Sequence, residues 1–331
     1  MTWLSDLTGI EEEDYESIHA NLILDGEKLT SKKNGRTFVC GRLETPMLVE
    51  LRRKIVDLQL DPKKTAISQI VGDVQKLHTD PQNANAVFQV ASQFNLLEMV
   101  GPTVTPEQGI GIYQFDRTQG PACAIAAGAG TIFRNYFAPV NGKVGQTSDN
   151  QIDCVADLGA QLGNNNGQLW KMQNGYLLPS EAGLRKIDET LRSLDEVGLD
   201  KLRCLLRVGI QWNTEVTISQ SGHLVTQVYG SAVPVSYSGL SPQLWENFAR
   251  LILEASYEAA FCASILNSQQ NGNKKLFLTM LGGGAFGNDP KWILAAIKRS
   301  MQLYSHHGLD VAIVSYGQAS SEIQTFIKDF Q

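Results

Sequence analysis

The chain has 331 residues, 43% of them hydrophobic, so it can bury a substantial core as one large domain or as two ordinary ones. Its formal charge of −6 gives no basic excess, and we therefore expect no binding to the phosphate backbone of duplex nucleic acid. No apolar run reaches the length of a membrane span, and the first residues lack the basic stretch of a secretory signal. We expect a protein that neither enters a membrane nor is secreted.

The five cysteines are scattered along the chain, and none shows a Cys-x-x-Cys spacing. This pattern is typical of reduced thiols in a cytoplasmic or nucleocytoplasmic protein, and it argues against a zinc knuckle. We predict neither a metal site nor a cofactor.

Residues 1–62 are predicted to form an amino-terminal extension made of a hairpin and a helix. Alternating apolar residues at 20–24, and the turn Lys33-Asn34-Gly35 before a second apolar run, favour the β-hairpin. A helix is predicted over 47–58, because four apolar residues spaced by three or four fall on one face, namely Leu48, Leu51, Ile55 and Leu58.

Three short apolar runs that end in polar residues or glycines predict strands. They are 66–71, followed by Gly72-Asp73-Val74, 86–91, followed by Ser92 to Asn95, and 276–281, followed directly by a glycine-rich turn. Ligands of an open α/β sheet bind at the carboxyl ends of its strands, where loops project functional groups. We therefore expect the site at these three strand ends.

The glycine-rich turn reads Gly282-Gly283-Gly284-Ala285-Phe286-Gly287-Asn288. Glycines accept a positive φ and let a ligand approach the backbone, and successive exposed N–H groups form a nest for an anion. Asp289 would occupy the start of the next helix, so we assign a phosphate or diphosphate to the amides of the turn itself. The alternative is a turn that is merely flexible.

A second loop, Asp116 to Pro121, leads into a small-residue helix over 122–136. The chain contains no P-loop, no His-Glu-x-x-His and no Gly-x-Ser-x-Gly, and the glycines near 128 do not complete a dinucleotide fingerprint. A P-loop NTPase, a zinc protease of that type, an ordinary α/β-hydrolase and a Rossmann protein are thereby disfavoured.

In their order, these landmarks resemble the macrodomain superfamily, with a more distant similarity to its poly(ADP-ribose) glycohydrolase-like members. Macrodomains have a strand with Gly-Asp-Ile, a strand with Asn-Ala-Ala-Asn, a glycine-rich helix start, a strand with a Val-x-Gly-Pro-like end and a Gly-x-Phe-Gly diphosphate loop. The resemblance covers residues 65–135 and 220–317. It implies a three-layer α/β/α domain with a mixed sheet over 63–331, with an insertion at about 137–213 that is helical near 182–207.

The resemblance also implies ADP-ribose, or an ADP-ribosylated macromolecule, as the partner. Asp73 and Val74 stand where macrodomains contact adenine, and Gln93 or Asn95 would approach the distal ribose. Strand for strand, Gln89 and Ser92 replace the two asparagines of the family. The diphosphate would lie between two groups of residues, with Gln119 and Gly120 on one side and Gly283, Gly284, Ala285, Phe286, Gly287 and Asn288 on the other.

Poly(ADP-ribose) glycohydrolases carry a Gln-Glu-Glu catalytic motif after a glycine run, and this sequence has no Gln-Glu-Glu. A hydrolase of ADP-ribosyl bonds needs an acid for the leaving group or a positioned water. Glu98 and Asp116 are the carboxylates that the sequence places best, and the alternative for each is a solvated or salt-bridged structural role.

Three functions fit these observations. The first is an enzyme that hydrolyses ADP-ribosyl linkages, the second is a reader that binds ADP-ribose without cleaving it, and the third is a nucleotide-binding scaffold whose insertion mediates assembly.

Overall fold

In a computed structural model, which describes residues 2–58 and 61–330, the chain is built around a seven-stranded sheet. Its strands are β4 (Arg42–Glu44), β5 (Ala66–Val71), β6 (Val87–Ala91), β11 (Gly209–Glu215), β12 (Leu224–Gly230), β13 (Lys275–Leu278) and β14 (Asp310–Ser315). They lie in the order β4-β11-β12-β6-β13-β14-β5. The five strands from β12 to β5 are parallel, whereas β11 runs antiparallel to β12 and β4 antiparallel to β11.

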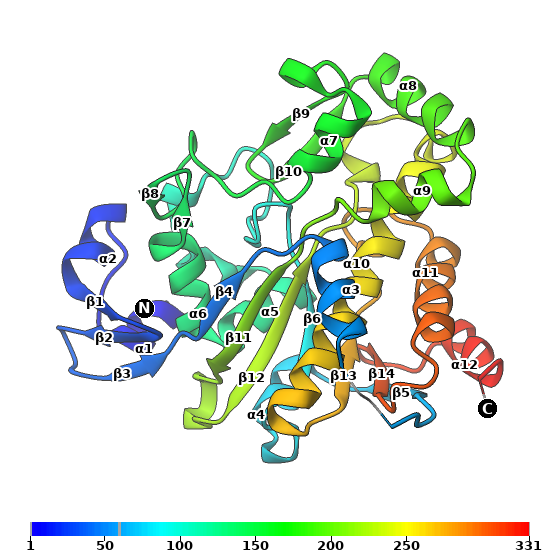
Figure 1. The fold of residues 1–331 in the computed structure, drawn as a ribbon. Helices are drawn as coiled ribbons and strands as arrows, with labels where there is room; N and C mark the ends of the chain where they lie inside the picture. The colour runs from blue at the N-terminus through cyan, green and yellow to red at the C-terminus, as the bar shows by residue number, and fades with distance from the viewer. Residues whose placement is uncertain (1, 59–60, 331) are drawn as a thin grey trace.

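Helices cover both faces of the sheet (Figure 1). One layer contains α3 (Leu48–Val56), α10 (Pro242–Asn271) and α11 (Pro290–Leu303), and the other contains α4 (Val74–Thr79), α5 (Gln119–Ala126) and α6 (Gly128–Ile132). The last helix, α12 (Ser321–Lys328), packs on β5. Residues of β6 and β12 are buried almost without interruption, as expected for parallel strands covered on both sides. The predicted three-layer α/β/α fold with a mixed sheet is confirmed.

The amino-terminal region contains α1 (Trp3–Thr8), α2 (Tyr15–Asn21) and a small antiparallel sheet. Its strands are β1 (Leu22–Asp25), β2 (Lys28–Ser31) and β3 (Thr37–Val39), and the predicted turn at 33–35 joins the last two. The predicted helix over 47–58 is present as α3. β4, however, pairs with β11 at the edge of the central sheet, so part of this region belongs to the main fold.

Glu12 fastens the amino-terminal region to a loop that leads toward the carboxyl end of the sheet. Its carboxylate accepts hydrogen bonds from the backbone N–H groups of Ile110 (2.9 Å) and Gly111 (2.7 Å), and from the hydroxyl of Tyr136. The indole N–H of Trp3 donates to the carbonyl of Ile110 at 2.9 Å. These bonds fix the loop that runs on to Asp116.

The region predicted as an insertion forms a lobe at one end of the sheet (Figure 1). Its elements are β7 (Pro139–Val140), β8 (Lys143–Val144), α7 (Ala156–Leu162), β9 (Trp170–Gln173), β10 (Tyr176–Pro179), α8 (Glu181–Arg192) and α9 (Glu196–Arg203). The predicted helical portion is two helices, since the Asp195 carboxylate accepts from the Gly198 N–H (2.8 Å) and starts α9 anew. The domain boundaries at 62 and at about 137–213 remain predictions.

None of the helices in the described ranges is both long enough and apolar enough to cross a membrane.

An ionic cluster joins this lobe and α3 to the helical layer. Glu258 of α10, whose side chain is 2% exposed, accepts from Arg52 of α3 (Nε to Oε1, 2.6 Å) and from Arg299 of α11. Arg52 also binds Asp200 of α9 through two hydrogen bonds of 2.7 and 2.9 Å. The cluster links four helices, because Glu258 of α10 and Asp200 of α9 each pair with both Arg52 of α3 and Arg299 of α11.

We expect Glu258→Gln to lower the free energy of unfolding by about 3 kcal/mol, since breaking one side of a buried ion pair leaves uncompensated charge. Urea denaturation measures the change. The matched control is Glu181→Gln, which breaks the exposed pair with Arg185 and should cost roughly 0.5 kcal/mol or less. Equal losses in the two variants would contradict this interpretation of the cluster.

Candidate functional site

Two adjoining cavities lie at the carboxyl ends of the parallel strands. The large cavity, about 880 Å³, is lined by residues that follow β5, β13 and β14, and the small cavity, about 440 Å³, by residues that follow β12, β6 and β13. Their walls share Asp116, Gln119, Thr279 and Met280. Together they form one elongated cleft with two chambers at the edge of the sheet where α/β proteins bind ligands.

The cleft forms where β6 and β13 diverge. Their pairing covers only Leu276 with Val87 and Phe277 with Phe88, so the predicted strand over 276–281 ends at Leu278. Beyond this point, the side chain of Gln119 replaces the missing strand. Its Oε1 accepts from the Ala91 N–H (2.9 Å), and its Nε2 donates to the Gln89 carbonyl (2.8 Å). The end of β6 thereby keeps its hydrogen bonds beside an open space.

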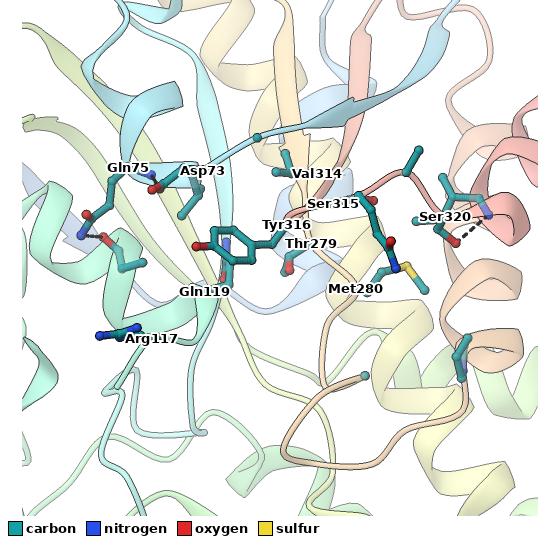
Figure 2. Close-up of a pocket in the computed structure, with 18 of the residues that line it drawn as sticks. Asp73, Gln75, Arg117, Gln119, Thr279, Met280, Val314, Ser315, Tyr316 and Ser320 are labelled. Atoms are coloured by element: carbon teal, nitrogen blue, oxygen red, sulfur yellow. Dashed lines mark hydrogen bonds between the residues drawn. The ribbon is translucent and has the colours of Figure 1, made fainter. Parts of the chain in front are cut away.

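The large cavity combines a carboxylate with an exposed aromatic ring. Asp73 caps the start of α4 by accepting from the Gln75 N–H at 2.8 Å, and Val74 lines the cavity beside it. Tyr316, which follows β14, is 84% exposed, and Figure 2 shows its ring extending across the cavity on the side of Gln119. The chamber therefore offers both a flat apolar surface and a hydrogen-bond acceptor.

The glycine-rich turn separates the two chambers. Gly283 lines the large cavity. Gly282 lines the small cavity, and so do the three residues that follow Gly283, namely Gly284, Ala285 and Phe286. Within the ranges that the structure describes, the backbone N–H groups of these three residues donate to no protein acceptor. Three unpaired amides in succession are suited to an anion.

The remaining residues of the turn hold its shape. Gly287 has a φ of +72°, and the Asn288 N–H donates to the Gly282 carbonyl at 2.9 Å. The Asn288 side chain, 2% exposed, donates to the carbonyl of Val233 at 2.9 Å. Neither Gly287 nor Asn288 lines either of the two cavities, and their predicted contact with a ligand stays a prediction. Asp289 caps α11 with its own carboxylate, as predicted.

The loop after β6 departs most from the predicted arrangement. Ser92 and Gln93 line the small cavity, but the Gln93 amide is engaged with the backbone of Met99 through bonds of 2.9 and 3.2 Å. Asn95 does not line either cavity, because the chain reverses at Leu96, whose φ is +66°. The Asn95 side chain is fully buried.

Glu98, from the same loop, lies at the wall of the small cavity and is 3% exposed. Within the described chain neither carboxyl oxygen has a hydrogen-bond partner, although Nη2 of Arg134 lies 3.6 Å from Oε1. Burial raises the pKa of Glu98 to about 8, against the opposing effects of Arg134 and of the Tyr113 hydroxyl. At neutral pH this carboxyl is therefore mostly protonated, and it can donate a proton.

Gly120 and Asp116 complete the wall opposite the glycine-rich turn. A Cβ at Gly120 would lie 2.0 Å from the Ala91 carbonyl oxygen, so only glycine lets α5 approach the end of β6 this closely. Asp116 stands in the wall that both chambers share, and its Oδ1 accepts from the Thr118 N–H at 2.8 Å.

Three aromatic rings line the small cavity. Phe286 is a predicted site residue, whereas Tyr176 and Tyr237 are not. Tyr176, Tyr237 and Phe286 pack against one another with centroids 5.2 to 5.6 Å apart. Tyr176 comes from β10 in the lobe, where no sequence signal points to the cleft. Tyr316 lies at a position with a local signal, because it directly follows β14, a strand with the apolar run 311–314.

No protein-family model matches the chain, and no curated protein matches it in sequence. Among solved structures, it is similar to a poly(ADP-ribose) glycohydrolase from Thermomonospora curvata (11% identity, 96% of each chain, TM-score 0.48). It is also similar to the Deinococcus radiodurans poly(ADP-ribose) glycohydrolase in complex with ADP-ribose (10%, 86% of this chain and 90% of that one, 0.42). A further match is an Oceanobacillus iheyensis macrodomain (12%, 82% and 94%, 0.36). These similarities are distant, at 10 to 12% identity.

The backbone conformation of the glycine-rich turn can be tested by glycine-to-alanine substitutions. Gly287→Ala should lower the free energy of unfolding by roughly 1–2 kcal/mol, because its φ is +72° and the new Cβ would lie 2.0 Å from Oγ of Ser236. Gly284→Ala, in the same turn, meets no atom within 4 Å and should change stability by about 0.5 kcal/mol or less. Thermal or urea denaturation compares the two, and equal effects would show that the turn does not have this conformation.

Proposed function

We propose that the chain binds ADP-ribose in the two-chambered cleft and hydrolyses ADP-ribosyl linkages. The observation that carries the proposal is the run of three unpaired backbone amides in the wall of the small cavity, next to Gly283 in the wall of the large one. A ligand suited to this arrangement has two bulky ends joined by a diphosphate. The resemblance of the sequence to macrodomains points to the same ligand.

The large cavity is the proposed place for the adenosine end. Its Tyr316 ring offers a face for stacking on a base, and the Asp73 carboxylate offers an acceptor for an exocyclic amine. Arg117 is exposed, lines this chamber and adds a positive charge to its wall. The phosphates would then accept from the N–H groups of Gly284, Ala285 and Phe286.

The small cavity is the proposed place for the distal ribose, whose sugar carbons would pack on the ring of Phe286. Glu98 lies in this chamber's wall with an unpaired carboxyl group. In the proposed reaction Glu98 gives its proton to the leaving oxygen as the C1–O bond breaks. A water oxygen then bonds to C1, and its proton passes to Asp116. The acid therefore comes from the loop after β6, in place of a Gln-Glu-Glu motif.

A reader that binds ADP-ribose without cleaving it is the second candidate. Two observations favour it: the sequence has no Gln-Glu-Glu, and Glu98 is almost entirely enclosed, which restricts how closely a leaving group can approach its carboxyl. Binding is common to both candidates, and only turnover separates them.

For binding, we expect ADP-ribose to titrate with a micromolar Kd by calorimetry. Asp73→Asn should weaken it about tenfold, because an asparagine still caps α4 but loses the charge of the acceptor. The control is Asp80→Asn, which alters an equivalent cap outside the cleft and should leave the Kd unchanged. The absence of binding at millimolar ADP-ribose would refute the proposal.

For turnover, we expect Glu98→Gln to abolish the release of ADP-ribose from ADP-ribosylated protein while binding persists. In the wild type, the rate should hold below about pH 8 and fall above it, because the acid is active only while protonated and its pKa is raised to about 8. Glu181→Gln, at an exposed position that lines neither cavity, is the matched control and should keep its activity. Full activity in Glu98→Gln would favour the reader or a different acid.

A further inference from the structure

Arg134 is a fully buried guanidinium directly behind the small cavity. It belongs to a short π-helical turn, Phe133–Phe137, a backbone irregularity that recurs at functional sites. Its Nε donates to the Leu96 carbonyl (3.1 Å) and its Nη2 to the Thr131 hydroxyl (3.1 Å). Nη1 has no partner among the described residues. Such a charge is costly to bury, and ordinary packing gives no reason for it.

The face of Tyr229 supports the guanidinium. Its ring centroid lies 3.6 Å from the central carbon of Arg134, a distance typical of a cation–π contact. The Tyr229 hydroxyl donates to the side chain of Gln227, and Gln227 in turn donates to the carbonyl of Cys123 at 2.8 Å. The ring is therefore fixed from behind, and Arg134 has little freedom to move.

Arg134 lies close to Glu98 but forms no hydrogen bond with it. The separation of 3.6 Å between Nη2 and Oε1 lets the positive charge act on the carboxyl while both carboxyl oxygens stay free. A guanidinium bound through two hydrogen bonds, as Arg52 is to Asp200, would instead occupy the oxygens and hold the carboxylate ionised.

We propose that Arg134 is a positioning residue for the reaction proposed above: its charge, 3.6 Å from the Glu98 carboxyl, keeps that carboxyl at the wall of the small cavity with both oxygens free. This inference rests on the proposed function for its catalytic meaning. The effect of the Arg134 charge on the neighbouring Glu98 carboxyl does not depend on a bound ligand.

The other groups that face Glu98 carry no compensating positive charge. Tyr113, Tyr229 and Cys123 approach it from three different elements, and burial raises the pKa of each, so all three are neutral near pH 7. Asp116, in the same cavity wall, contributes a negative charge. Removing Arg134 would therefore leave the Tyr113 hydroxyl as the remaining opposition to burial, and Glu98 would hold its proton to a higher pH.

The test follows the Glu98 carboxyl carbon by ¹³C NMR in the full-length, ligand-free protein, with Glu98→Gln to assign the signal. The wild type should titrate near pH 8. Arg134→Gln should raise the midpoint by roughly one pH unit, whereas Arg134→Lys, which keeps the charge, should stay within about half a unit of the wild type. In the active enzyme the alkaline limb of the rate should move with the midpoint.

A matched pair at Tyr229 covers the case in which Arg134→Gln does not fold. Tyr229→Phe keeps the ring under the guanidinium and should leave the midpoint in place. Tyr229→Leu removes the ring, releases Arg134 and should shift the midpoint upward, in the same direction as Arg134→Gln.

The outcomes of the NMR titration and of the binding experiment are independent. A wild-type midpoint near that of an ordinary glutamate, or a folded Arg134→Gln or Tyr229→Leu with an unchanged midpoint, would overturn the role of Arg134. Absence of ADP-ribose binding with the expected midpoints would instead overturn the proposed function and leave the Arg134–Glu98 coupling standing.

Discussion

The cleft depends on the divergence of β6 from β13. A parallel sheet stays closed as long as each strand can pair with its neighbour, and an unpaired buried backbone group is costly. The amide of Gln119 removes that cost by binding the Gln89 carbonyl and the Ala91 N–H, so the two strands can diverge and leave space between them. A glycine is needed at position 120, beside Gln119. Any larger residue there would push α5 away from β6 and move the Gln119 side chain out of hydrogen-bonding distance.

Segments outside the central sheet complete the cleft that this divergence opens. Glu12 holds the loop that carries Asp116, and Tyr176 reaches the small cavity from the lobe and donates to the Met99 carbonyl at 2.7 Å. The ionic cluster around Glu258 fixes the same lobe to the helical layer. The amino-terminal region and the lobe are thus parts of the site, although in sequence they look like additions to a smaller domain.

How much the sequence predicts depends on whether the signal is local. β5 was predicted over the residues it occupies, and the glycine-rich turn was found because apolar runs and glycines are read from neighbouring residues. The sequence predicts Asn95 as a ligand contact, and it gives no signal for the positive φ of Leu96, where the loop turns back and leaves Asn95 outside both cavities. The contribution of Tyr176 could not be predicted either, since it depends on a contact between segments about 80 residues apart.

Glu98 shows why an acid with a raised pKa need not be visible as a sequence motif. A carboxyl becomes a proton donor at neutral pH when its surroundings disfavour the charged form, and those surroundings are built from residues far apart in the chain. Here the enclosure comes from α5 and the loop after β6, while the opposing charge comes from a π-helical turn. The balance between burial and Arg134 leaves the pKa at about 8, high enough to retain the proton and low enough to release it. A sequence that lacks the Gln-Glu-Glu motif can therefore still hold a carboxyl that is protonated at neutral pH, because its protonation depends on the environment of the side chain.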